Sequence, residues 1–229
     1  MKYLALFCLA AAVVVFPVTA HADWTENFDS YAQGSSMHGQ GGWHGWDDNS
    51  GATAYVSGDQ SLSSPNSVNI TGASDLVHEY TGYTSGQWIY TAWQYIPTNF
   101  SGTSYFILLS DYADFGPYAW VTQVQFNSAG YVQDDATGTQ LSLITGRWVE
   151  IRVEIDLATD TQTFYYDNQM LYSGSWSDWF GYGGTVQVAA VDLYANSASP
   201  VYYDDMSLLP GGGIPAEDTS WGAVKSLFR

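Results

Sequence analysis

Positively charged residues are scarce in this sequence. Five lysines and arginines stand against 23 aspartates and glutamates, which gives a formal net charge of −18. A surface of this charge repels the phosphates of nucleic acids and the headgroups of anionic membranes, and it attracts cations. The composition therefore argues against nucleic acid as a partner and against strongly anionic glycans as ligands.

Cysteine is nearly absent as well, and the one copy, Cys8, lies in a segment that we expect to be removed. A positively charged start, an apolar run over residues 4–18 and an Ala-His-Ala cleavage sequence are typical of a secretory signal peptide over residues 1–22. The run is too short for a comfortable membrane span. We therefore predict a secreted bacterial protein, extracellular or periplasmic, that begins at Asp23 and needs no disulfides.

The chain also lacks helical periodicity in its main body and shows a period of two instead. Every second residue from Val149 to Ile155 is β-branched and apolar, and polar residues lie between them. This pattern is typical of a strand with one buried face. A polar turn, a second strand over residues 163–167, a tight turn at Asp167-Asn168 and a third strand over 170–172 follow. The stretch predicts a β-meander.

Other short segments rich in β-branched and aromatic residues are separated by Gly, Ser, Pro and Asn, which favour turns. Together they predict a single all-β domain, an antiparallel two-sheet β-sandwich, over residues 23–209. The further strands are expected at residues 26–29, 54–56, 67–71, 76–80, 87–96, 105–109, 120–126, 184–194 and 201–209.

Two motifs in these strands are shared with known proteins. The first is W-x-x-I-x-V-x-I-D from Trp148, followed after a turn by Y-x-D-N-x-x-L-Y from Tyr165, and the second is the closing strand V-Y-Y-D-D-M-S-L-L from Val201. The first resembles the central hairpins of the concanavalin A-like lectin and glucanase superfamily, which includes laminin-G-like domains, and the second resembles the closing strand of carbohydrate-binding jelly rolls. The resemblance implies a jelly-roll sandwich and a role in carbohydrate recognition or cleavage.

A glucanase-like activity would require a particular pattern of carboxylates along one strand. Retaining glucanases of this fold carry E-x-D-x-E or E-x-D-x-x-E, because two carboxylates must flank the scissile bond. Glu154-Ile-Asp156 begins the pattern, but Ala158 and Thr159 stand where the second glutamate belongs. Alginate lyases of this fold would need a Q-[IV]-H strand, and the closest match lacks the histidine. We expect a non-catalytic protein, with Glu150 and Glu154 as the alternative catalytic pair.

Aromatic residues are abundant, and several lie in segments that we expect to be loops. Aromatic rings stack on the C–H faces of sugars, while amides and carboxylates satisfy the hydroxyl groups. We expect Trp93, Trp120 and Trp148, which lie in predicted strands, to belong to the core. The predicted carbohydrate-binding residues are Trp43, Trp46, Tyr112, Phe115, Tyr118, Trp176 and Trp179.

Acidic residues near both ends of the domain suggest a structural calcium site. By parity, Asp204 shares a strand face with apolar residues, and a buried carboxylate needs a partner. In the resembling jelly rolls such an acid meets the first strand at a calcium ion, so Asp29 is the matching ligand and Asp205 the alternative to Asp204. The other explanation is a carboxylate that accepts hydrogen bonds from backbone amides at the edge of the sandwich.

A glycine-rich linker and a short tail over residues 210–229 follow the domain. Acids at the start of the tail and Lys225 and Arg229 near its end predict a short helix. This helix either packs on the sandwich or docks to a sorting or surface partner, and the sequence favours neither.

We predict a secreted, non-catalytic, lectin-like protein that binds a neutral or weakly charged glycan. Two other functions stay open. One is a glycoside hydrolase or polysaccharide lyase of the same fold, and the other is a structural or adhesive surface protein.

Overall fold

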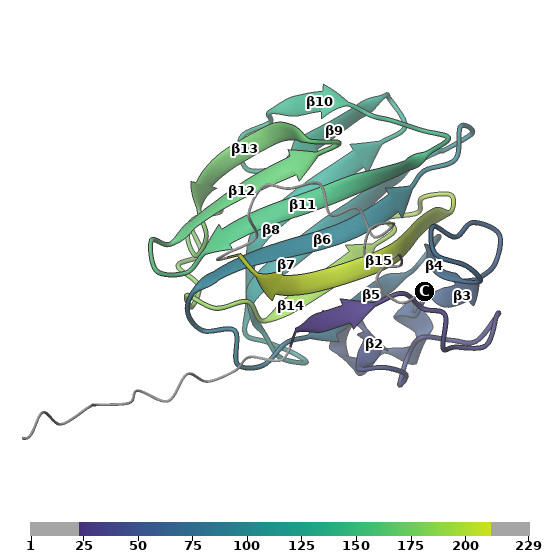
Figure 1. The fold of residues 1–229 in the computed structure, drawn as a ribbon, viewed down its shortest axis with the longest axis horizontal. Coiled ribbons are helices and arrows are strands. Elements are labelled where there is room, and N and C mark those ends of the chain that lie inside the picture. The colour runs from purple at the N-terminus through teal and green to yellow at the C-terminus, as the bar shows by residue number, and fades with distance from the viewer. Residues whose placement is uncertain (1–22, 212–229) are drawn as a thin grey trace, which may run out of the picture.

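A computed structural model of the protein describes residues 23–211. The predicted signal peptide over residues 1–22 and the predicted tail helix lie outside the described residues. The described chain forms two antiparallel β-sheets that face each other as a sandwich (Figure 1), so the predicted fold class is confirmed. Residues 23–211 contain no helix that is long and apolar enough to cross a membrane.

The first sheet, sheet A, has eight strands. Strand β15 lies at its centre beside β6, although the two strands are far apart in sequence, and β1 also pairs with β15. In spatial order the strands are β13 (Gln169–Ser175), β12 (Thr161–Tyr166), β11 (Trp148–Asp156), β6 (Gln87–Tyr95), β15 (Val201–Pro210), β4 (Ser67–Ile70) and β3 (Tyr55–Ser57), with β1 (Trp24–Glu26) off this path.

The second sheet, sheet B, has seven strands and lies behind sheet A in Figure 1. Strand β2 (Trp43–Gly45) is the first strand of this sheet in sequence, and two 3-10 turns follow it, η1 (Trp46–Asp48) and η2 (Ser50–Ala52). In spatial order the strands are β10 (Gln140–Ser142), β9 (Tyr131–Asp134), β8 (Tyr118–Asn127), β7 (Thr103–Tyr112), β14 (Ala190–Tyr194), β5 (Asp75–Glu79) and β2 (Trp43–Gly45).

The meander predicted from the alternating pattern is present as β11, β12 and β13. Val149, Ile151 and the other alternate residues of β11 are buried, and the polar residues between them are partly exposed. Asp167 and Asn168 join β12 to β13 with φ angles of 51° and 59°. Two successive positive φ angles are typical of a type I′ hairpin turn, whose twist matches that of the strands.

The outward faces carry three tryptophans that we had expected in the core. Along β6 the buried residues alternate with partly exposed ones, and Trp93 is among the latter. Trp148 is likewise partly exposed on β11, and Trp120 is partly exposed on β8. The core prediction for these residues is therefore wrong, because Tyr90 and Ala92 on β6 occupy the inward positions.

Three short strands, β2, β9 and β10, were not predicted, and the first strand was predicted too late. β1 ends at Glu26, and Phe28 lies beyond it with a φ of 59° and a fully buried ring. An apolar residue followed by an acid therefore marks a buried turn here rather than a strand.

Two groups of apolar side chains organise the molecule. The larger fills the space between the sheets. The smaller lies on the outer face of sheet B, where Val77, Ile107, Leu109 and Ala190 are buried under partly exposed aromatic rings. An outer sheet face that is apolar at its base and aromatic at its surface is a natural place for a binding site.

Candidate functional site

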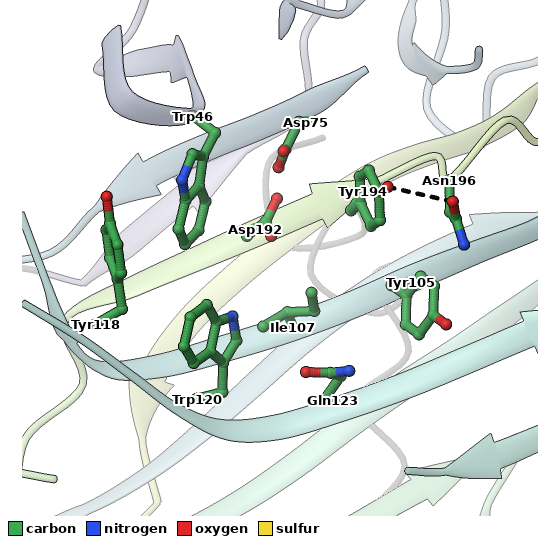
Figure 2. Close-up of a pocket in the computed structure, with 10 residues that line it drawn as sticks. All are labelled: Trp46, Asp75, Tyr105, Ile107, Tyr118, Trp120, Gln123, Asp192, Tyr194 and Asn196. Carbon is green, nitrogen blue, oxygen red and sulfur yellow. Dashed lines mark hydrogen bonds between the residues drawn. The ribbon is translucent and has the colours of Figure 1, made fainter. Parts of the chain in front are cut away.

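A cleft of about 420 Å³ lies on the outer face of sheet B (Figure 2). We call it the aromatic cleft. Strands β5, β7, β8 and β14 supply most of its lining, while Trp46 of η1 and Asn196, just after β14, complete it. The lining residues are Trp46, Asp75, Tyr105, Ile107, Tyr118, Trp120, Gln123, Asp192, Tyr194 and Asn196.

Sheet register explains why these residues meet. Asp192 on β14 is level with Ile107 on β7, and Ile107 is level with Gln123 on β8. Tyr194 and Tyr105 form the next row on the same face. Side chains in paired positions on one face lie about 5 Å apart at Cβ. The rows therefore place polar groups and rings side by side across the sheet.

Trp46 reaches the cleft because its turn is tied to the loop between β7 and β8. The Asp47 carboxylate accepts hydrogen bonds from the Phe115 amide, at 2.8 Å, and from the Tyr118 hydroxyl. The Asp47 amide in turn donates to the Tyr112 hydroxyl at 3.1 Å. Asp47 has a φ of 55°, which aspartate tolerates better than most residues. These contacts close one end of the cleft.

Three rings form one wall of the cleft. The centroid of Trp46 lies 4.8 Å from that of Tyr118 and 6.0 Å from that of Trp120. The Trp46 and Trp120 planes differ by 9°, so the two indoles are nearly parallel. At the other end, Tyr105 and Tyr194 stack at 5.7 Å, and the Tyr194 hydroxyl donates to Asn196 at 3.2 Å. The cleft thus has aromatic surfaces at both ends.

A carboxyl pair lies between these rings. Asp75 and Asp192 face each other in Figure 2, and each carboxyl group perturbs the ionisation of the other. Burial, with repulsion from Asp75, raises the pKa of Asp192 well above its usual range. Burial also raises the pKa of Asp75. Two carboxyl groups that face each other in a buried site share a proton, because ionising the second beside the first is costly.

The predicted aromatic residues fall into two groups. Trp46 and Tyr118 line the cleft, and Tyr112 packs against both of them at 5.0 and 5.8 Å. Phe115 donates its amide to Asp47 beside Trp46, and 81% of its surface is exposed. The structure therefore brings together the residues predicted in the turn at 46 and in the loop at 112–118. Whether they bind a glycan stays a prediction.

The other three predicted aromatic residues lie away from the cleft. Trp43 is 1% exposed and Trp176 is fully buried, so neither ring offers a face to a ligand. Trp179 packs flat on Tyr172 at 4.9 Å and donates to Asp134, away from the cleft lining. Assigning Trp43 and Trp176 to a binding surface was wrong, because glycine-rich and serine-rich surroundings did not keep these large rings out of the core.

Glu150 and Glu154 lie on β11, on the outer face of the opposite sheet. Arg152 lies 3.5 Å from Glu154, and its guanidinium stacks over Tyr165 at 4.3 Å. The alternative catalytic pair is therefore on sheet A, and neither glutamate lines the aromatic cleft on sheet B.

The three aspartates considered as calcium ligands, Asp29, Asp204 and Asp205, bind the loop at residues 62–66. Asp204 is fully buried, and its carboxylate accepts the amides of Leu62 at 2.7 Å and Ser63 at 3.1 Å. Asp29 accepts the amide of Asn66 at 3.0 Å, and Asp205 accepts the Ser63 hydroxyl at 2.7 Å.

This is the backbone-amide arrangement considered from the sequence. Residues 23–211 contain no group of three or more His, Cys, Asp or Glu placed to hold a metal ion. A calcium ion here would need carbonyl and hydroxyl oxygens as further ligands, and calcium binding stays a prediction.

Sequence reasoning missed eight of the ten lining residues, including three aromatic and two acidic ones. Tyr105, Trp120 and Tyr194 lie in strands and were assigned to none of the predicted sites, since a strand aromatic is more often core than surface. Asp75 and Asp192 carried a usable signal: Asp192 is the one charged residue within V-Q-V-A-A-V-D-L-Y. A lone carboxylate in an apolar strand needs a partner or a function.

No family model matches the chain, and no curated protein matches it. Among solved structures, a sialidase superposes with a TM-score of 0.55 over 83% of this chain at 8% identity, and the chain spans 19% of that protein's length. The cellulose-induced protein Cip1 superposes with a TM-score of 0.51 at 14% identity, covering 81% of this chain and 96% of that protein.

An endo-β-1,4-glucuronan lyase from the fungus Trichoderma reesei also superposes with a TM-score of 0.51, at 11% identity, covering 81% of this chain and 94% of the lyase. Identities this low carry information on the fold alone. In fold, this chain is similar to the β-sandwich regions of carbohydrate-active proteins.

Proposed function

We propose that the domain binds a carbohydrate in the aromatic cleft of sheet B. The observation that carries this proposal is the meeting of exposed ring surfaces with carboxyl and amide groups in one hollow. Trp46, Tyr118 and Trp120 offer apolar faces, and Asp192, Gln123 and their neighbours offer hydrogen-bonding groups. Sugars combine apolar C–H faces with a rim of hydroxyl groups, and this lining complements both.

The dimensions of the cleft support the same ligand class. A volume of about 420 Å³ falls within the range of about 300–1,000 Å³ that is usual for small-molecule sites. The apolar base formed by Ile107 and its buried neighbours holds the rings in place without covering them. A site that is formed before binding loses little conformational entropy when the ligand arrives.

Binding is favoured over cleavage by the carboxyl geometry. A retaining glycosidase separates its two carboxyl groups by about 5–5.5 Å to hold the scissile bond between them. Asp75 and Asp192 instead face each other directly and perturb each other's ionisation. Burial also raises the pKa values of Tyr105 and Tyr194, which makes either phenol a weaker candidate for a tyrosinate base. The names of the similar structures give only weak support to the hydrolase or lyase alternative.

The proposed setting is outside the bacterial cytoplasm, after removal of residues 1–22. N-terminal sequencing of the protein recovered from culture medium or periplasm, with Asp23 as the expected first residue, tests this part. Docking of the tail to a surface partner likewise stays a prediction.

The test of binding is isothermal titration of the chain from Asp23 onward against a panel of soluble oligosaccharides. Trp120→Ala should weaken binding about tenfold, or about 1.4 kcal/mol, because one ring face is lost. Trp148→Ala is the matched control, since Trp148 is a partly exposed tryptophan on the outer face of sheet A.

Equal affinities for Trp120→Ala and wild type would place the site elsewhere. Failure of every glycan to bind wild type would reject the function. An assay for new reducing ends and unsaturated products, run on the same panel, would detect cleavage and so promote the enzyme alternative.

A further inference from the structure

Asp192 is a buried acid with an incomplete set of partners. The residue is 3% exposed, and it lines the aromatic cleft. Its Oδ1 atom receives no hydrogen bond from an amide, a hydroxyl or a cationic side chain of residues 23–211. Asp75 is its neighbour in the pair, and it too is an acid. A buried carboxyl group without a compensating donor is costly to the fold.

The surroundings of the pair contain no compensating positive charge. Two carboxyl groups and no lysine, arginine or histidine line the cleft. The cations of the described chain are Arg147 and Arg152, and both pair with acids of sheet A, at 2.6 Å from Asp167 and 3.5 Å from Glu154. Asp47 adds negative charge near Asp75. The cleft is therefore a region of negative potential.

We propose that the aromatic cleft takes a cationic sugar, an oligosaccharide with a free, protonated amino group, and that Asp75 and Asp192 bind this group. The inference rests on the proposed carbohydrate-binding function and names its ligand class. A carboxyl pair that shares one proton carries one negative charge, which one ammonium group neutralises. The ammonium group also brings three N–H donors, and these can satisfy the free lone pairs of the pair.

The aromatic walls fit the same group. Ammonium ions are attracted to the faces of tryptophan and tyrosine within about 6 Å of the ring centroid. In Figure 2 the carboxyl pair lies between the ring of Trp46 and the ring of Tyr194. A hard metal ion fits less well, because calcium takes about 6–8 oxygen ligands and the walls supply mainly ring carbons. An acetylated amine would lose the charge and gain bulk at this point.

The experiment compares three matched β-1,4-linked oligosaccharides of one length, built from glucosamine, N-acetylglucosamine and glucose. Each is titrated into the chain from Asp23 onward, in a slightly acidic buffer that keeps the free amines protonated. We expect the glucosamine oligomer to bind about tenfold more tightly than the other two. Calcium chloride titrated alone is the probe for a metal ion.

Asp192→Asn should abolish the preference for the glucosamine oligomer, so that this variant binds the glucosamine and glucose oligomers with equal affinity. Asp75→Asn is the second variant, at the less buried position, and Glu154→Gln is the matched charge control on sheet A. Circular dichroism establishes that each variant is folded.

Equal binding of all three oligomers to wild type would overturn the inference and leave the proposed function standing, whereas no binding of any would reject both. A preference for the amine that survives in both aspartate variants would also overturn the inference, as would calcium binding that Asp192→Asn abolishes.

Discussion

The carboxylate of Asp47 accepts a hydrogen bond from the Tyr118 hydroxyl and so joins the 3-10 turn η1 to strand β8. This hydrogen bond raises the pKa of Tyr118 to about 12, because the neutral phenol is the donor. The same oxygen also accepts the Phe115 amide at 2.8 Å. One carboxylate therefore positions Trp46, its neighbour in sequence, the start of β8 at Tyr118, and the loop that carries Phe115.

The first prediction concerns this anchor. Asp47→Ala removes the acceptor, and the turn that holds Trp46 is then no longer tied to the loop at 112–118. We expect glycan affinity to fall about tenfold, the equivalent of about 1.4 kcal/mol, while the core is unchanged. Isothermal titration and thermal melting measure the two effects.

Asp47→Asn is the matched control for that change. Asparagine tolerates a positive φ and keeps one side-chain oxygen as an acceptor, so most of the affinity should survive. If alanine and asparagine have the same effect on affinity, the hydrogen bonds of Asp47 do not position Trp46 in the manner described.

The strands could be predicted because their physical signal is local. In β11 the alternation of apolar and polar residues follows directly from the pleat, and in Asp167-Asn168 the turn chemistry demands residues that tolerate a positive φ. The cluster around Trp46, Tyr112 and Tyr118 was also anticipated, because core packing does not require large rings in polar and glycine-rich segments.

The burial of Trp43 and Trp176 could not be predicted in the same way. It depends on contacts with segments that are distant in sequence: Trp43 packs against Trp24 at 6.2 Å, and the Trp176 indole donates to the carbonyl of Gln187 at 2.9 Å. The meeting of Asp75 with Asp192 likewise needs the pairing of β5 with β14, which no local pattern specifies.

The second prediction separates a core tryptophan from a surface tryptophan. Trp176→Ala should lower the free energy of unfolding by about 3–5 kcal/mol, because it removes a fully buried ring. Trp93→Ala should cost about 1 kcal/mol, since Trp93 is partly exposed on the outer face of β6. Urea denaturation of both variants gives the comparison, and equal losses would contradict the assigned faces of the sheet.

The third prediction concerns the loop held by Asp204. Asp204→Ala leaves the amides of Leu62 and Ser63 without their acceptor and should destabilise the domain by about 2–3 kcal/mol. Asp29→Ala removes the acceptor of a single amide, that of Asn66, from a less buried position, and it should cost about 1 kcal/mol. Chemical denaturation measures both losses, and a larger loss for Asp29→Ala would reverse the assigned roles.

The fourth prediction tests the calcium site on the same residues. An ion held by Asp29 and Asp204 would stabilise the folded state by about 2.7 kcal/mol when its concentration is a hundred times its dissociation constant. Thermal melting with calcium and with a chelator measures this directly. Midpoints that agree would remove the calcium site and leave backbone amides as the partners of these carboxylates.

The last prediction concerns His78, an 8% exposed histidine whose Nε2 accepts the indole N–H of Trp24 at 3.2 Å. Burial lowers its pKa from 6.5 to about 4. Between these values the unfolded chain binds the proton more readily than the folded one, so this contribution to stability is complete above pH 6.5 and is lost as the pH falls toward 4. The shift corresponds to about 3 kcal/mol.

Asp204 has the opposite effect to His78 on the pH dependence of the free energy of unfolding. Burial raises its pKa from 3.8 to about 7, so its contribution grows as the pH falls through this range. The effect of His78 must therefore be measured against His78→Gln, which keeps an acceptor for Trp24 but does not titrate. Denaturant unfolding between pH 7 and pH 4 should show wild type losing about 3 kcal/mol more than the variant. Parallel curves for the two proteins would mean that His78 accepts a proton in the folded state as readily as in the unfolded chain.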